Sequence, residues 1–196
     1  MKITAGSCRG MSLQCPKGEL TRTTSAKVRE AVMNMLSPWL DEAVFIDLFA
    51  GSGSMGMEAL SRGAQGAIFV EENREALKCL KKNADLCLIR CKNADHSPEP
   101  FKIVPGDVTG ALRGLSKRLK ADIVWADPPY HESVNWLCGQ DLGLVFDLLN
   151  PGGILAVEAR SSDAGSMTMP ESEAGRWELL KKKKYGESLV VIWRKN

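Results

Sequence analysis

The sequence lacks any uninterrupted apolar run of the roughly 18 residues that a membrane-spanning helix needs. Its first residues form no hydrophobic core of a secretory signal peptide. The six cysteines include no CxxC pair and lie mostly in apolar segments, which favours reduced, packing side chains over a disulfide framework. These absences exclude an integral membrane protein and predict a cytoplasmic one.

Formal net charge is also small, at +2, but it is unevenly distributed. Residues 1–30 hold six basic side chains against two acidic ones. A local positive segment suits a polyanionic partner, because neutralising phosphates releases counterions. A solvated, partly flexible N-terminus accounts for the same charges equally well.

With 196 residues and 44% hydrophobic side chains, the chain can bury the core of one globular domain. Apolar, β-branched runs predict strands at 44–49, 67–71, 101–104, 122–126, 154–158 and 189–193. The first five are separated by segments long enough for helices, and the clearest helical patterns are 55–62, 74–85 and 133–149. This alternation predicts an α/β fold with a mostly parallel sheet and helices on both faces.

The two ends of the chain complete the expected architecture. Residues 177–180 and 189–193, joined through 181–186, are expected to form an antiparallel hairpin, which gives seven strands with a reversed final strand. Near the N-terminus we expect a small hairpin of residues 3–5 and 13–15, then a helix capped by Thr24 that ends near Leu36. We therefore predict one domain, 1–196, in which residues 1–40 form a basic hairpin and helix and residues 41–196 form the core.

A glycine-rich motif, Gly51-x-Gly53-x-x-Gly56, lies at the end of the first core strand, where a helix is expected to begin. Bare backbone at such a turn lets a ligand approach closely. Glu71 ends the next strand 20 residues after Gly51, where an acid can reach the ribose hydroxyls of a bound nucleoside. Nicotinamide cofactors and S-adenosylmethionine both fit this pattern. Asp47 favours the second, because a carboxylate attracts a cationic amino-acid group and repels a pyrophosphate.

A second motif, Asp127-Pro128-Pro129-Tyr130, directly follows the apolar run 122–126. Ligands of open α/β sheets bind at the carboxyl ends of the strands. The prolines stiffen the turn and remove two backbone donors, which leaves carbonyl acceptors beside the Asp127 carboxylate. Such acceptors suit an exocyclic amine whose base stacks on Tyr130.

With these two motifs, the chain resembles the class I S-adenosylmethionine-dependent methyltransferases. Within them it resembles the bacterial RsmD family, which methylates a guanine N2 amine of 16S rRNA. Further family-like stretches are Ile3-Thr4-Ala5-Gly6, Val28-Arg29-Glu30 and the run from Gly56 to Ala64. One departure is Thr23, where the family usually has proline. The resemblance implies a Rossmann-like class I methyltransferase fold with a small N-terminal extension.

The resemblance also implies roles for individual residues. S-adenosylmethionine would be bound by Asp47, Phe49, Gly51, Ser52, Gly53, Glu71, Asp107 and Asp127. The catalytic residues would be Asp127, Pro128, Pro129 and Tyr130, which hold the target base. Apart from the resemblance, we expect RNA to be contacted by Arg9, Arg22, Arg29 and Asn34. The implied partner is the 16S rRNA of the small ribosomal subunit, and we expect a monomer without a metal ion.

Other functions stay open at this point. A DNA adenine-N6 methyltransferase would use the same cofactor and the same Asp127–Tyr130 motif, although 196 residues leave little room for a separate target-recognition domain. A non-catalytic nucleotide-binding or RNA-binding module could keep the glycine-rich turn. A dehydrogenase would need a Tyr-x-x-x-Lys pair, which neither tyrosine provides. The run Lys181, Lys182, Lys183 and Lys184 suits either a solvated turn or an extra phosphate contact.

Overall fold

The structure, a computed structural model, describes residues 1–16, 25–91, 100–129 and 133–196. Thr24, which we expected to cap the first helix, lies outside these ranges, as do Arg22, Thr23 and Tyr130. The chain divides into two compact units, Met1–Val108 and Thr109–Asn196, which we describe in turn. None of the helices described could cross a membrane, since none is both long and apolar enough.

The first unit contains three parallel strands and the helices that pack on them. Its elements are α1 (Ala26–Leu36), the short helix η1 (Ser37–Trp39), β1 (Val44–Leu48), α2 (Ser54–Ser61), β2 (Gly66–Glu71), α3 (Arg74–Cys91) and β3 (Phe101–Pro105). Strand β2 pairs in parallel with both β1 and β3, with Leu48 opposite Val70 and Glu71 opposite Pro105. The loops that follow all three strands therefore begin at one edge of the sheet.

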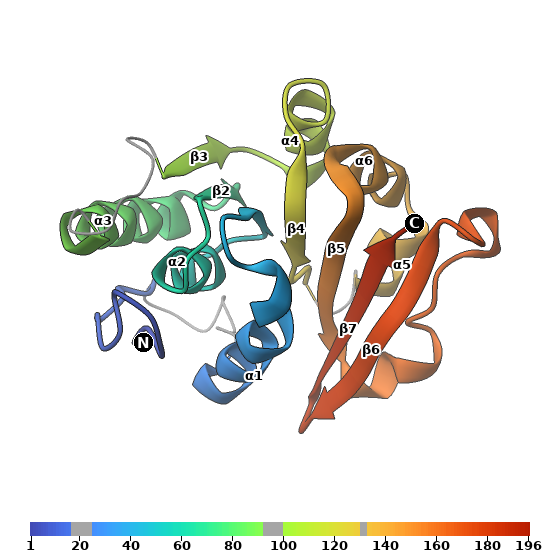
Figure 1. Cartoon of the computed structure of the whole chain (residues 1–196), viewed down its shortest axis with the longest axis horizontal. Helices are drawn as coiled ribbons and strands as arrows, with labels where there is room; N and C mark the ends of the chain where they lie inside the picture. The colour runs from blue at the N-terminus through green and yellow to red at the C-terminus, as the bar shows by residue number, and fades with distance from the viewer. Residues whose placement is uncertain (17–24, 92–99, 130–132) are drawn as a thin grey trace. The chain divides into compact units, whose positions relative to one another are not determined.

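The N-terminal segment packs into the core of this unit. Ile3 N donates to Met11 O at 3.0 Å and Leu13 N donates to Met1 O at 2.8 Å, so a hairpin forms as predicted. Its arms meet at the bridge between Lys2 and Ser12, and are not the expected 3–5 and 13–15. The side chains of Ile3, Met11 and Leu13 are buried in one cluster with residues of α2, β2 and α3. Figure 1 shows this segment beside α2 and α3. A flexible N-terminal arm is therefore excluded for residues 1–13.

The second unit contains the remaining four strands. Its elements are β4 (Ala121–Ala126), α5 (Ser133–Cys138), α6 (Asp141–Leu148), β5 (Leu149–Arg160), the short helices η2 (Ser161–Gly165) and η3 (Glu171–Glu173), β6 (Trp177–Tyr185) and β7 (Ser188–Lys195); α4 (Val108–Leu115) begins at the boundary. Strand β5 is parallel to β4 and antiparallel to β7, and β6 is antiparallel to β7. The strand order is β3-β2-β1-β4-β5-β7-β6. The predicted seven-stranded, mostly parallel α/β fold with a reversed final strand is confirmed.

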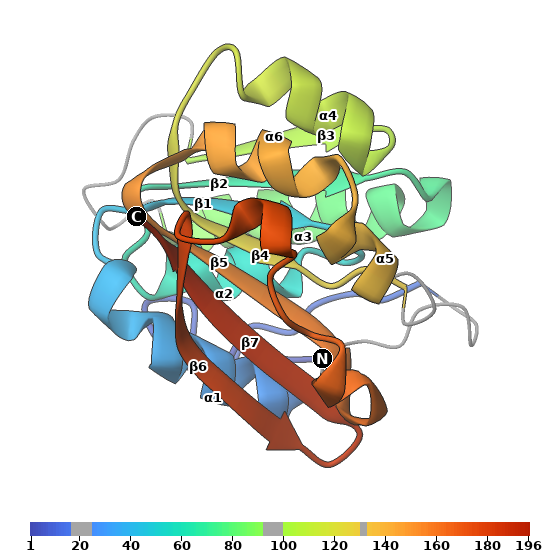
Figure 2. The same ribbon diagram turned by 90° about the vertical axis from the view of Figure 1, so that its right-hand side faces the viewer.

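Several predicted boundaries were wrong. The expected helix 133–149 is two helices, α5 and α6, interrupted at Gly139 and Gln140. Residues 181–185, expected in a turn, continue β6, because backbone pairing with β7 accommodates a polar segment (Figure 2). Helix α1 is capped by Ser25, whose hydroxyl accepts from Val28 N at 3.2 Å. Helix α4 was not predicted.

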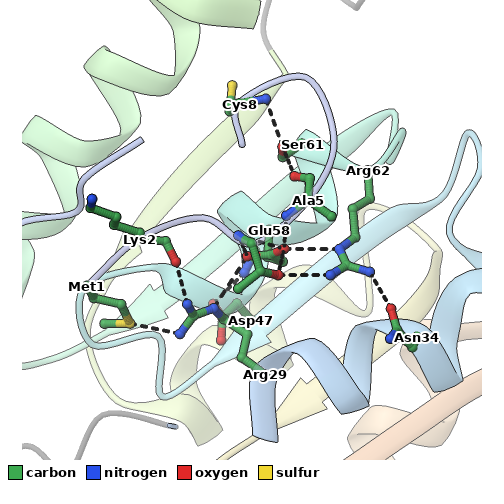
Figure 3. A network of polar contacts seen from close by, with 12 residues as sticks. Met1, Lys2, Ala5, Cys8, Arg29, Asn34, Asp47, Glu58, Ser61 and Arg62 are labelled. Atoms are coloured by element: carbon green, nitrogen blue, oxygen red, sulfur yellow. Dashed lines mark hydrogen bonds and ion pairs between the residues drawn. The ribbon is translucent and has the colours of Figure 1, made fainter. Parts of the chain in front are cut away.

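A buried carboxylate joins the N-terminal segment to α1 and α2 (Figure 3). The Glu58 side chain is fully buried and accepts from Thr4 N at 2.9 Å and Ala5 N at 3.0 Å. It also pairs with Arg62 Nε at 3.0 Å and with Arg29 Nε at 3.4 Å. Burial alone would raise the pKa of Glu58, but the hydrogen bonds from Thr4 and Arg62 outweigh it and lower the pKa. The carboxylate is thus held ionised between two guanidinium groups.

We expect Glu58→Gln to lower the free energy of unfolding by about 3–5 kcal/mol, because the buried Arg29 would lose its counter-charge. Chemical denaturation would measure the change. Glu75→Gln is the matched control: Glu75 pairs with Lys78 at the surface, where such a pair contributes less than about 1 kcal/mol.

The pH dependence has a definite sign, because a lowered carboxyl pKa stabilises the fold above the unfolded-state pKa. The contribution of Glu58 to the free energy of unfolding should be lost as pH falls through the acid range. The Glu58→Gln variant should therefore lose less stability in that range than the wild-type chain. Equal stability of the Glu58→Gln and Glu75→Gln variants would contradict this account of Glu58.

Candidate functional site

The glycine-rich turn connects β1 to α2 at the carboxyl edge of the first unit. Phe49, Gly51 and Gly53 have φ angles of 62°, 56° and 80°, all in the left-handed region. Gly53 N donates to Ala50 O at 2.7 Å, and Ala50 N donates to Val70 O at 2.9 Å. The turn is therefore closed on itself and fastened to the neighbouring strand β2.

The three glycines of the motif serve different purposes. A Cβ atom added to Gly53 would lie 2.3 Å from Leu80 Cδ1, and one added to Gly56 would lie 2.3 Å from Phe69 Cε1. A Cβ added to Gly51 would meet no atom within 4 Å. Gly56 thus permits close packing of α2 on the sheet, and Gly53 permits close approach of the turn to Leu80 of α3. Gly51 has open space beside it that a ligand could fill.

Glu71, at the end of β2, reaches this turn. Its Oε2 accepts from Gly51 N at 2.6 Å and its Oε1 accepts from Asn73 N at 2.7 Å. Asp107 is exposed in the loop after β3, where the preceding Gly106 N donates to Glu71 O at 3.0 Å. The 20-residue spacing therefore brings an acid to the first glycine. That this acid also reaches a ribose stays a prediction.

Asp47 lies within β1, directly beneath the turn. Its side chain is buried, and its Oδ2 accepts from Gly56 N at 2.9 Å, one of the free amides in the first turn of α2. Loss of hydration on burial raises the pKa of Asp47 to about 8; the Gly56 hydrogen bond opposes this shift and the charge of Glu71 adds to it. A cationic ligand beside this turn would favour the ionised form of Asp47 and so lower its pKa.

Ser52, also in the turn, is fixed by a residue that sequence reasoning missed. The side chain of Asn83 in α3 is fully buried, and its Nδ2 donates to Ser52 O at 3.0 Å. The same amide accepts from Gln14 N and donates to Gln14 O, both at 2.8 Å. Asn83 therefore connects the glycine-rich turn to the N-terminal segment. No local pattern in a helical sequence distinguishes such an asparagine from a solvent-exposed one.

In the second unit, Asp127 follows the last residue of β4. Asp127 is half-buried, Pro128 is buried and Pro129 is exposed. The register places Ala126 opposite Val157 of β5, so Glu158, which is buried, is the next residue along the paired strand. Tyr130 and His131 lie outside the described residues. The structure therefore describes this motif only as far as Pro129, and the stiff turn stays a prediction.

The four residues expected to contact RNA have different surroundings. Arg9 is exposed, and Asn34 is exposed with its Oδ1 accepting from Arg62 Nη1 at 2.8 Å. Arg22 lies outside the described residues. The expectation for Arg29 is wrong: this side chain is fully buried, pairs with Glu58 and donates to Lys2 O at 2.5 Å (Figure 3). Its guanidinium group is paired inside the unit and is not presented to a phosphate.

Metal ligands do not gather anywhere in the described ranges: no group of three or more His, Cys, Asp or Glu side chains there could hold a metal ion. Cys91 and His96 fall where side chains are not described. Cys8 and Cys87 are buried with their sulfur atoms 3.8 Å apart.

Comparison with known proteins identifies the family. A family model described as "Conserved hypothetical protein 95" matches residues 1–194. The protein named ribosomal RNA small subunit methyltransferase D of Escherichia coli K12 is 32% identical over 200 residues, which cover 100% of this chain and 90% of that protein. The chain belongs to the RsmD family.

Solved structures agree with the fold. A hypothetical protein of Thermus thermophilus has a TM-score of 0.76 at 25% identity, with 98% of each chain covered. An RNA methyltransferase from Salinibacter ruber, solved in complex with S-adenosyl-L-homocysteine, has a TM-score of 0.61 at 17% identity, covering 89% of this chain and 94% of that one. The fold is that of the class I methyltransferases.

Substitution of the first two motif glycines should separate ligand binding from folding. Gly51→Ala fills open space and carries only the left-handed backbone strain, about 1 kcal/mol. It should therefore reduce the free energy of S-adenosylhomocysteine binding by more than it reduces the free energy of unfolding. Gly53→Ala carries the same strain and also forces Leu80 to move, so it should lower stability further. Calorimetric titration and thermal unfolding of both variants would test this. If Gly53→Ala weakened binding more and Gly51→Ala lowered stability more, the space beside Gly51 would not be a ligand site.

Cofactor binding should depend on pH through Asp47. With its pKa raised to about 8, the carboxyl group is mostly neutral below that pH, yet attraction to an ammonium group requires the ionised form. The affinity for S-adenosylhomocysteine should therefore rise between about pH 6 and pH 8, by up to about tenfold per unit. Asp47→Asn should be weaker and nearly independent of pH in this interval. A wild-type affinity as flat as that of Asp47→Asn would refute the role.

Proposed function

We propose that this protein transfers a methyl group from S-adenosylmethionine to the exocyclic N2 amine of a guanine in the 16S rRNA of the small ribosomal subunit. The observation that carries the proposal is family membership over residues 1–194, with 32% identity along the whole chain to a small subunit rRNA methyltransferase. The acidic, glycine-lined turn in the first unit supports it independently, since such a turn suits a nucleoside with a cationic end.

The residues present fit the cofactor. When bound, S-adenosylmethionine supplies an electrophilic methyl group on a sulfonium sulfur. The open space beside Gly51 would admit its ribose, and the Glu71 carboxylate, which already holds Gly51 N, keeps further lone pairs for the ribose hydroxyls. In this proposal Asp47 faces the amino-acid end and Asp107 accepts from the adenine amine, while Phe49, Ser52 and Gly53 complete the turn.

Asp127 and the Pro128 carbonyl would hold the target amine. The N2 lone pair of guanine is delocalised into the ring, so the nitrogen must become pyramidal before it attacks the methyl carbon. Two acceptors, one for each N2 hydrogen, favour that geometry, and their attraction grows as positive charge develops on nitrogen. The methylated amine is a strong acid, so Asp127 or water can take the proton without a strong base. Pro129 would stiffen the turn and Tyr130 would stack on the base.

RNA contacts in this proposal come from Arg9, Arg22 and Asn34. The exposed positions of Arg9 and Asn34 are compatible with this role. Because the substrate is ribosomal RNA, the enzyme would act in the cytoplasm. We further propose that it acts as a monomer, which light scattering of the purified protein would test.

Loss of the Asp127 carboxylate should greatly slow methyl transfer while cofactor binding persists. We expect Asp127→Ala to lower kcat by about 100-fold to 1,000-fold, as for removal of one transition-state hydrogen-bond partner. Its affinity for S-adenosylhomocysteine should fall much less than kcat, because seven other residues are also expected to bind the cofactor. Asp85→Ala, which removes an exposed carboxylate from α3, is the matched control. Near-normal turnover by Asp127→Ala would eliminate this mechanism.

The substrate is tested by methyl transfer from labelled S-adenosylmethionine to small subunits that lack the modification, to naked 16S rRNA and to duplex DNA. Label recovered as N2-methylguanosine from rRNA is the expected result. Label in DNA adenine would replace the proposal by a DNA adenine-N6 methyltransferase. Cofactor binding without label in any substrate would favour a non-catalytic binding module.

A further inference from the structure

The strand β6 carries the most concentrated exposed charge in the second unit. Lys181, Lys182, Lys183 and Lys184 are consecutive and all exposed. β6 stands last in the strand order, beside β7 alone, and Figures 1 and 2 both show the two strands side by side. The proposed function uses none of these four residues.

The lysines divide between the two faces of the strand, because side chains alternate along a strand. Lys181 and Lys183 share one face with Tyr185, and Lys183 Nζ lies 5.3 Å from the centre of the Tyr185 ring. Lys182 and Lys184 share the other face, where Lys182 Nζ donates to Met167 O at 3.1 Å. The face of Lys181, Lys183 and Tyr185, which we call the lysine face, therefore combines two cationic groups with an aromatic ring.

The spacing on the lysine face suits a linear polyanion. Residues two apart on a strand are about 7 Å apart, which is comparable with the distance between successive phosphates of one RNA strand. Glu178, the nearest preceding acid on β6, pairs with Arg194 of β7, so its charge is already neutralised. The local excess of positive charge on β6 is therefore not cancelled by Glu178.

Lysines also protect an exposed edge strand from pairing with another chain, which is the simplest alternative role. That role needs charge at the edge but gives no reason for an aromatic ring on the same face. An acidic protein surface would satisfy the ammonium groups, but the ring adds a surface on which an unpaired base can stack. The combination favours single-stranded or loop RNA.

We propose that the lysine face of β6 binds the sugar–phosphate backbone of the RNA substrate, with Lys181 and Lys183 on successive phosphates and Tyr185 against a neighbouring base. This inference rests on the proposed function, since it assigns a second contact surface for the same RNA. Each ammonium–phosphate contact releases counterions, so the surface should contribute to the salt dependence of binding.

The test compares Lys181→Gln/Lys183→Gln with Lys182→Gln/Lys184→Gln, two variants with the same net charge on opposite faces of one strand. Binding to naked 16S rRNA would be measured over a range of salt concentrations. We expect the first variant to bind several-fold more weakly, and the negative slope of its log affinity against log salt to be smaller in magnitude by about 2. The second variant should change the slope by less than half as much. S-adenosylhomocysteine should bind all three proteins equally.

Other results would overturn the inference. An unchanged slope for Lys181→Gln/Lys183→Gln would overturn it. Aggregation of that variant on size-exclusion chromatography as well would indicate that the lysines protect the edge strand. Equal losses of rRNA affinity in both variants would also overturn it, since they would indicate diffuse electrostatic attraction without a defined binding face. The proposed function can fail separately from this inference. If wild-type protein bound rRNA through the lysine face but transferred no methyl group, the RNA-binding surface would be supported and the proposed methyl transfer refuted.

Discussion

Two guanidinium groups, those of Arg29 and Arg62, are held on either side of the Glu58 carboxylate, and the arrangement of the first unit depends on this contact. A buried arginine is tolerated only when a counter-charge and hydrogen-bond acceptors meet it. Glu58 supplies the charge, and the same carboxylate accepts from the backbone of Thr4 and Ala5. One side chain of α2 thereby fixes the entry of the N-terminal segment and the position of α1.

This contact changes how the charge of the chain is interpreted. In the sequence, Arg29 belongs to a basic N-terminal segment. In the structure its side chain is buried and paired with Glu58. The exposed positive charge near the N-terminus is correspondingly smaller, whereas β6 presents four lysines in succession to solvent. Net charge by segment therefore misplaces the electrostatic surface whenever one basic residue has a buried partner far away in the sequence.

Much of the fold and part of the site could be predicted from local patterns. β-Branched runs located the strands, and the glycine-rich motif correctly marked the turn between β1 and α2. These signals work because a strand and the turn after it are specified by neighbouring residues.

What could not be predicted depends on partners distant in the sequence. Residues 181–185 form a strand because β7 pairs with them, although their composition suggests a solvated turn. The burial of Arg29 depends on Glu58, 29 residues further along the chain. Neither outcome has a signature within a few residues, so tertiary context overrides local preference at both places.

The side-chain amide of Asn83 in α3 holds two other segments, through Gln14 and through the carbonyl of Ser52. Toward Gln14 it makes the pair of hydrogen bonds that a neighbouring strand would make, and toward Ser52 it adds a restraint to a turn that Val70 and Glu71 of β2 already hold. The rigidity of that turn therefore depends on the packing of both α3 and β2. A ligand that binds there meets a loop already ordered, and less conformational entropy is lost on binding.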